Sequence, residues 1–169
     1  MNKELIINSA PTGVEIALLE NKHLVEFHQE SHNASFTVGD LYLGKVKKLV
    51  PGMNAAFVDV GFEKDGFLHY TDLSPYIRSL IKFTSQSINH KEEHPADFAQ
   101  FQNEQEIIKT GKIGEVFPNK PSVLVQILKE PIAAKGPRLS CEISLPGRFV
   151  VVTPFNDIVA VSRKIRSEE

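Results

Sequence analysis

The sequence has one cysteine, no tryptophan and no long hydrophobic segment. A single cysteine cannot form an intramolecular disulfide, which excludes a disulfide-stabilised scaffold and fits a cytoplasmic protein. Cys141 is expected to be a small buried residue rather than a nucleophile. No segment approaches the ~20 apolar residues of a membrane-spanning helix, so we expect no membrane partner. The N-terminus does not resemble a signal peptide.

An excess of positive charge is also lacking. The chain has 19 Lys and Arg against 21 Asp and Glu, a net charge of −2. A strongly basic chain is the simplest signature of a nucleic-acid binder, so a nucleic-acid role would require a local basic patch. Basic residues outnumber acidic ones between residues 129 and 166. The hydrophobic fraction of 41% is ordinary for a globular protein and argues against general disorder.

Most of the chain has the pattern of β-strands. Residues 14–20 and 23–27 flank the short link Asn21-Lys22, which predicts an antiparallel hairpin. The polar residues 29–36 are typical of a linker. The other predicted strands are residues 41–50, 54–60, 66–69, 122–128, 138–145, 148–153 and 158–162.

A helix and a loop interrupt these strands. Ser74 can cap a helix that has Pro75 at its first position and apolar residues at helical spacing up to Ile81. Residues 84–105, rich in Ser, Gln, Asn and Glu, predict a long exposed loop. Between residues 38 and 145 the strands number five, as in a small Greek-key barrel of the OB type.

Such barrels bind single-stranded nucleic acid by stacking bases on aromatic side chains, at ~1–3 kcal/mol per base. Phe57 and Phe67 lie on adjacent predicted strands, and His69 shares the face of Phe67 because side chains alternate along a strand. Lysine and arginine side chains on the neighbouring strands suit phosphate contact. The candidate RNA-binding residues are Phe57, Phe67, His69, Lys45, Lys135 and Arg138.

Each residue also has a plainer interpretation. A phenylalanine in an apolar strand, like Phe57, more often belongs to the core. His69 alone would be an ordinary surface histidine, and Lys47-Lys48 alone a solvated face. Only the combination favours nucleic-acid binding.

The acidic residues predict no metal site. Asp59, Glu63 and Asp65 fall in a predicted hairpin, where surface turns are far commoner than metal sites. His90 and His94 have helical spacing, but they lie in a polar loop without a nearby cysteine.

Several segments resemble the S1-type RNA-binding domain, and more narrowly the version in the ribonuclease E/G family, closest to ribonuclease G-like proteins. The resemblance covers nearly the whole chain and is weakest over residues 84–120. It is carried by VGDLYLGKV (38–46), PGMNAAFVDVG (51–61), KDGFLH (64–69), KGPRLS (135–140) and ISLPGRFVV (143–151).

The resemblance implies an RNase H-like subdomain that is interrupted by the barrel. Residues 1–36 would be its first part and residues 143–169 its second, truncated part. Residues 37–142 would form the S1-type barrel, with residues 71–120 as its helix and flexible insertion. The expected fold is therefore mainly β, with an incomplete subdomain on both sides of the barrel.

The resemblance also implies roles for particular residues. In the family, two aromatic residues and a lysine of the S1-type domain contact single-stranded RNA, and they match Phe57, Phe67 and Lys135. A 5′-monophosphate sensor is built partly from backbone at positions that match Gly147 and Val151, so this chain would hold only part of that pocket.

The implied activity is Mg²⁺-dependent hydrolysis of RNA by an endoribonuclease of RNA processing and decay. The catalytic carboxylates of the family lie in a later nuclease domain, so we expect neither catalytic residues nor a cofactor in this chain. The longer protein would require Mg²⁺ and would join this region to the nuclease domain, with homo-oligomerisation left open.

Two alternatives remain open. The chain could be a stand-alone S1-type accessory module without nuclease activity. It could also be a protein-interaction module that acts through residues 84–120.

Overall fold

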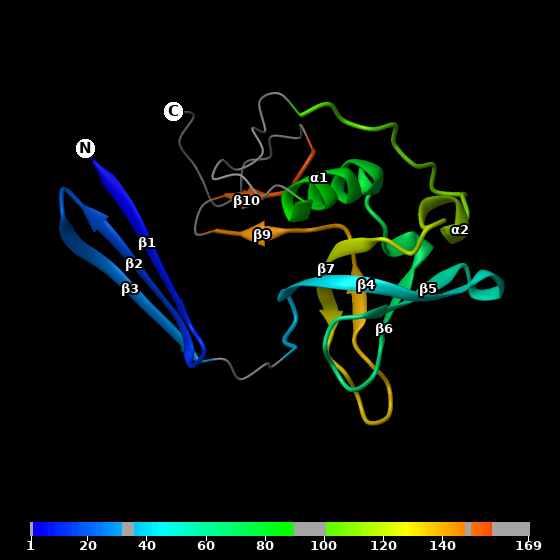
Figure 1. Ribbon diagram of the computed structural model, residues 1–169, viewed down its shortest axis with the longest axis horizontal. Helices are drawn as coiled ribbons and strands as arrows, with labels where there is room; N and C mark the ends of the chain where they lie inside the picture. The colour runs from blue at the N-terminus through cyan, green and yellow to red at the C-terminus, as the bar shows by residue number, and fades with distance from the viewer. Residues whose placement is uncertain (1, 32–35, 90–100, 148–149, 157–169) are drawn as a thin grey trace, which may run out of the picture. The chain divides into compact units, whose positions relative to one another are not determined.

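The computed structural model describes residues 2–31, 36–89, 101–147 and 150–156. The chain divides into two units, Met1–Ser35 and Phe36–Glu169 (Figure 1). That the parts outside the barrel form an RNase H-like subdomain stays a prediction.

The first unit is a three-stranded antiparallel sheet. It consists of β1 (Lys3–Ala10), β2 (Gly13–Glu20) and β3 (His23–Ser31), in that order. Asn21 and Lys22 both have positive φ, 49° and 66°, which suits the two-residue turn of the predicted hairpin. Residues 29–31, expected to be linker, instead continue β3. A polar sequence suits that strand because β3 lies at the edge of this sheet.

The second unit contains a closed five-stranded barrel, which confirms the OB/S1-type fold class. Its strands are β4 (Leu41–Val50), β5 (Ala55–Asp59), β6 (Gly66–His69), β7 (Ser122–Lys129) and β8 (Arg138–Ser140). They follow the order β4-β5-β6-β8-β7, and β7 pairs with β4 to complete the circle. Only the pairing of β6 with β8 is parallel among these five strands.

Side chains alternate between the inside and the outside of the barrel. In β5, Ala56 and Val58 are fully buried and Phe57 between them is partly exposed. In β6, Leu68 is fully buried and the preceding Phe67 is partly exposed. The other strands add further apolar side chains to the interior. These are Val46, Val123, Val125, Ile127 and Leu139.

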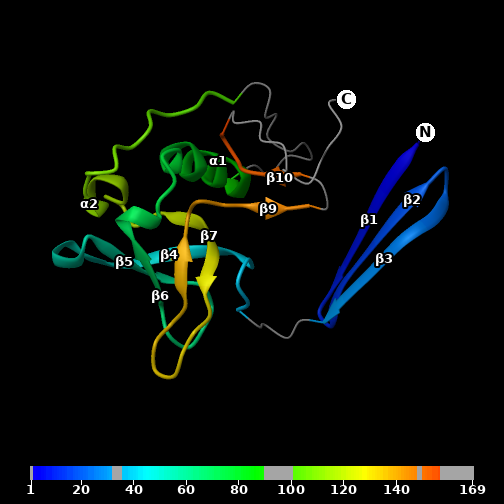
Figure 2. The ribbon, with the colours of Figure 1, turned by 180° about the vertical axis from the view of Figure 1, so that it is seen from behind.

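The predicted helix is present as α1 (Ile77–Asn89), which packs against β7 (Figure 2). The Ser74 hydroxyl accepts a hydrogen bond from the Tyr76 amide at 3.1 Å, but Ser74 and Pro75 belong to the turn before the helix, which begins at Ile77 rather than at Pro75 as predicted. Residues 84–89 were wrongly assigned to a loop. Thr84 is buried, and its hydroxyl donates to the carbonyl of Leu80 at 2.7 Å, so a polar residue extends the buried face of the helix.

The described end of the insertion is held against the barrel rather than being a free loop. Asn54 is the main link, because its amide nitrogen donates to the Gly111 carbonyl at 3.0 Å and its oxygen accepts from the Ile113 amide at 2.7 Å. A short helix that the sequence did not predict, α2 (Ile113–Val116), follows. It places Phe117, which is fully buried, in the core. Residues 90–100 lie outside the described residues.

The strands after the barrel are shorter than predicted. β8 ends at Ser140, because the Cys141 amide donates to the carbonyl of Asp72 at 2.8 Å and leaves the ladder. β9 (Leu145–Pro146) and β10 (Val151–Val152) form an antiparallel pair. The predicted strand 158–162 and residues 148–149 lie outside the described residues. Within the described ranges, no helix has the length and apolar character needed to cross a membrane.

Replacing Asn54 should loosen the insertion. Asn54→Ala removes two hydrogen bonds and leaves alanine at a φ of 47°, so the free energy of unfolding should fall by about 2–4 kcal/mol. Asn54→Gly removes the same bonds without strain and should cost less. Urea unfolding measures both, with the exposed Asn89→Ala as the control. Equal stability of the Ala variant and the unmodified chain would contradict this role.

Candidate nucleic-acid interface

A row of outward-facing residues crosses four strands of the barrel. Phe57 of β5 lies directly opposite Phe67 of β6. Lys48 of β4 is the partner of Phe57 on one side, and Arg138 of β8 is the partner of Phe67 on the other. The ring centroids of the two phenylalanines are 5.9 Å apart, with an interplanar angle of 67°. The structure therefore brings together the two aromatic residues that the sequence singled out.

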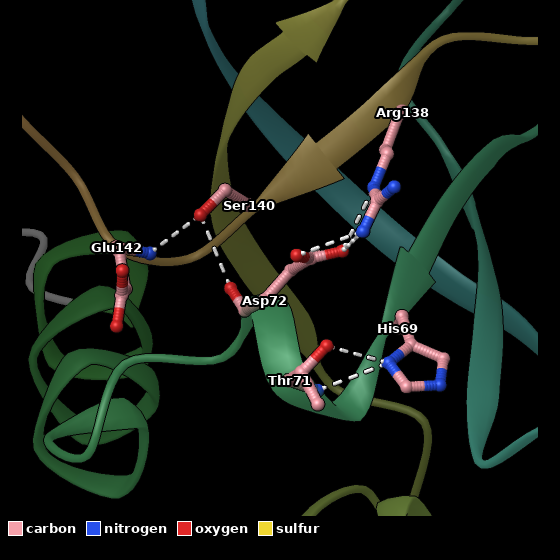
Figure 3. A network of polar contacts seen from close by, with 6 residues as sticks. All are labelled: His69, Thr71, Asp72, Arg138, Ser140 and Glu142. Atoms are coloured by element: carbon pink, nitrogen blue, oxygen red, sulfur yellow. Dashed lines mark hydrogen bonds and ion pairs between the residues drawn. The ribbon is translucent and has the colours of Figure 1, made fainter.

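His69 extends this row along β6. Its ring centroid lies 6.4 Å from that of Phe67, and the two planes differ by 29°. The Nδ1 atom of His69 is 2.7 Å from the Thr71 hydroxyl and accepts a hydrogen bond from the Thr71 amide at 3.2 Å (Figure 3). Thr71 is thus a positioning residue for the imidazole ring, and sequence reasoning missed it.

The lysines of β4 are not equivalent. The Lys47 ammonium lies 2.7 Å from the Asp59 carboxylate and 3.4 Å from that of Asp65. The hydrogen bond between Lys47 and Asp59 raises the pKa of Lys47 and lowers the pKa of Asp59. Lys45 and Lys48 are exposed, and neither has an ion pair within the described part of the chain.

Lys48, rather than Lys45, stands beside the aromatic pair. A register irregularity between Val46 and Lys48 shifts the strand, so that Lys45 pairs with Asp59 and Lys48 pairs with Phe57. A bulge of this kind leaves no periodic signal in the sequence. The sequence analysis selected Lys45 as a candidate on this strand, whereas the structure pairs Lys48 with Phe57; an RNA contact by either lysine stays a prediction.

Lys135 lies in the loop between β7 and β8, and the end of this loop packs closely against the β5–β6 turn. A Cβ atom on Gly136 would collide with the backbone carbonyl of Asp65, so only glycine allows the loop to approach the β5–β6 turn so closely. The next residue, Pro137, accepts a hydrogen bond from the Phe67 amide at 2.8 Å. These contacts hold the exposed Lys135 near the aromatic row.

Arg138 has a structural partner. Its Nε and Nη2 atoms donate to the two oxygens of Asp72, each at 3.1 Å, and the Asp72 side chain is only 12% exposed. The backbone carbonyl of Asp72 accepts from the Ser140 hydroxyl at 3.1 Å (Figure 3). The bidentate geometry uses the donors with which an arginine would bind phosphate. Arg138 therefore joins β8 to the segment after β6, and its predicted RNA contact stays a prediction.

The two positions assigned to a phosphate sensor lie elsewhere. Gly147 follows β9, and its amide donates to the Val150 carbonyl at 2.7 Å. Val151 pairs with Pro146 across the β9–β10 ladder. Both residues belong to this hairpin and not to the aromatic row, and their role also stays a prediction.

The described residues do not fit a magnesium site, since they contain no cluster of three or more His, Cys, Asp or Glu side chains. Asp59 and Asp65 instead share Lys47. Cys141 is buried, and burial together with the nearby charge of Asp72 raises the pKa of its thiol, which makes it a poor nucleophile.

Comparison with known proteins gives a consistent set of relatives. No family model matches the sequence. The chain is 37% identical over 166 residues to ribonuclease G of Haemophilus influenzae, covering 98% of the chain and 30% of that protein. It is 32% identical over 168 residues to ribonuclease G of Escherichia coli, covering 99% and 30%. It is 39% identical over 132 residues to ribonuclease E of a Nostoc species, covering 78% and 15%.

A double-mutant cycle should measure how much the Arg138–Asp72 interaction contributes to the free energy of unfolding. Arg138→Gln and Asp72→Asn should each lower the free energy of unfolding by about 1–2 kcal/mol. The first leaves the poorly exposed Asp72 carboxylate without its partner, and the second leaves the Arg138 guanidinium without its acceptor. The double variant should lose less than the sum of the two. Urea unfolding of the four proteins measures this, with Lys47→Gln as an exposed ion-pair control. If the loss of the double variant equals the sum of the two single losses, the interaction between Arg138 and Asp72 does not contribute to stability.

Proposed function

The chain belongs to the ribonuclease E/G family, and on that premise we propose that it captures single-stranded RNA for a longer endoribonuclease. The observation that carries this proposal is the outward row formed by Phe57, Phe67 and His69, with Lys48 beside it, which has no ion pair among the residues that the structure describes. The chain spans about 30% of the length of the ribonuclease G proteins that it matches.

Stacking would supply most of the affinity. Phe57 and Phe67 are partly exposed although their neighbours along each strand are buried, so their rings offer apolar surface to a ligand. A base stacked on an aromatic side chain contributes ~1–3 kcal/mol and requires no particular base identity. The tethered ring of His69 offers a further surface in the same line. The site is therefore suited to RNA that is unpaired but not to one defined sequence.

Phosphate contacts would come from a few local cations. Lys48 lies beside Phe57, Lys45 lies further along the same strand, and Lys135 lies on the loop next to Phe67. Lys47 is neutralised by its carboxylate partners, so it contributes little to a phosphate contact. A local set of this size is compatible with a net charge of −2 for the chain.

The longer protein would carry out the chemistry. We infer that it is an endoribonuclease of RNA processing and decay, which hydrolyses the phosphodiester with Mg²⁺ held by carboxylates of another domain. The present chain would orient the strand, and backbone near Gly147 and Val151 would form part of a site for a 5′-phosphate. The names and lengths of the relatives support this proposal over a stand-alone accessory module.

Removing the aromatic rings tests the proposed function. The double variant Phe57→Leu and Phe67→Leu keeps apolar volume but loses the stacking surface, so the affinity for single-stranded RNA should fall about tenfold or more. Fluorescence anisotropy at fixed salt measures the affinity, and circular dichroism checks the fold. Phe27→Leu, an exposed phenylalanine of the first unit, is the matched control. Unchanged affinity in a folded double variant would overturn the proposal.

A cleavage assay tests whether RNA binding and catalysis lie in different domains. The chain alone should leave single-stranded RNA intact in the presence of Mg²⁺, because the catalytic carboxylates are proposed to lie in another domain. Binding measured on the same sample shows that the protein is competent. Robust Mg²⁺-dependent cleavage by the purified chain would contradict the proposed division.

A further inference from the structure

A small pocket is lined by Tyr70 and Thr71, the residues that directly follow β6. Its volume is about 240 Å³, below the ~300–1,000 Å³ of sites for drug-sized ligands, so it suits a ligand of the size of a single base. The floor is apolar and includes Tyr70, Leu73 and Ile107. Tyr70 and Leu73 are buried, which makes this floor part of the barrel core.

Thr71 links the pocket to the proposed RNA-binding row, because it lines the pocket and contacts His69. Phe57 and Phe67 are 5.9 Å apart, and Phe67 and His69 are 6.4 Å apart. His69 contacts Thr71 at 2.7 Å, and Thr71 forms part of the pocket wall. A strand that stacks on the phenylalanines and passes His69 therefore reaches this pocket next.

The far wall comes from the insertion, and it carries Lys109. The backbone around this lysine is fixed, because the Ile107 amide donates to the Pro75 carbonyl at 2.9 Å and the Tyr70 hydroxyl donates to the Ile108 carbonyl at 2.6 Å. The Lys109 side chain is exposed and has no ion pair among the residues that the structure describes. Lys82, in contrast, is held by a carboxylate at 2.7 Å.

We propose that this pocket is a subsite for one further nucleotide of the bound RNA strand, with Lys109 on its phosphate. The inference rests on the proposed function and extends the same track. The base would lie against the apolar floor, and the phosphate would stay outside, because the Glu142 carboxylate in the pocket wall repels an anion. The Thr71 hydroxyl and the Glu142 carboxylate offer polar partners to the edge of the base.

Oligonucleotide length separates this subsite from the aromatic row. Anisotropy is measured over a salt series with single-stranded RNA of about three and about ten nucleotides, which lie below and within the usual site sizes of OB folds. Lys109→Gln should weaken the binding of the longer RNA by roughly three- to tenfold and reduce its salt slope by about 0.7, the value for one phosphate contact. The binding of the shorter RNA should not change.

The control is Lys120→Asn, which removes an exposed lysine of the same insertion and keeps a residue that tolerates its φ of 47°. It should bind both RNAs like the unmodified chain. If Lys109→Gln also binds both RNAs normally, or weakens both equally, the subsite is overturned while the proposed function stands. If the unmodified chain binds neither RNA, the proposed function fails and the subsite with it.

Discussion

The barrel closes through two pairings between strands that are distant in the chain, β7 with β4 and β6 with β8, and the outward face depends on the parallel pairing of β6 with β8. The two strands are short, four and three residues, so their ladder contains few hydrogen bonds. Leu68 and Leu139, partners in the register, are both fully buried and supply the packing that the ladder lacks. The hydrogen bond from the Phe67 amide to the Pro137 carbonyl holds the end of the loop that precedes β8. Without this closure, Phe67 and Lys135 would belong to separate, unrelated segments.

Local pairing decides which charges are available on that face. Asp59 and Asp65 engage Lys47, and Asp72 engages Arg138, so these two cations serve the barrel more than a ligand. Lys48, which pairs with Phe57, and Lys135, in the loop before β8, have no such partners within the described residues. The net charge of −2 therefore says little about the interface. Because ion pairing is short-ranged in water, the cations that lie next to the rings matter more than the chain's total.

Local signals explain what could be predicted. The bounds of β4 and β6 were correct, because turn residues mark them: Pro51-Gly52 follows β4, and residues 61–65 precede β6. The alternation of side chains along a strand placed His69 on the face of Phe67. The extent of α1 was underestimated, because the polar Thr84 was taken as the start of an exposed loop although its side chain is buried. The link from Asn54 to the insertion spans more than fifty residues and has no local signature.

The sequence by itself determined the strand pattern, the aromatic pair and the family, because these depend on residue type and short spacing. Only the tertiary structure decided that Lys48 stands beside Phe57, that Arg138 is bound to Asp72, and that Lys109 reaches a pocket beyond His69. The physical reason is that a bulge shifts the register and barrel closure joins residues that are distant in the chain. Neither event changes the local pattern of apolar and polar residues from which a sequence prediction starts.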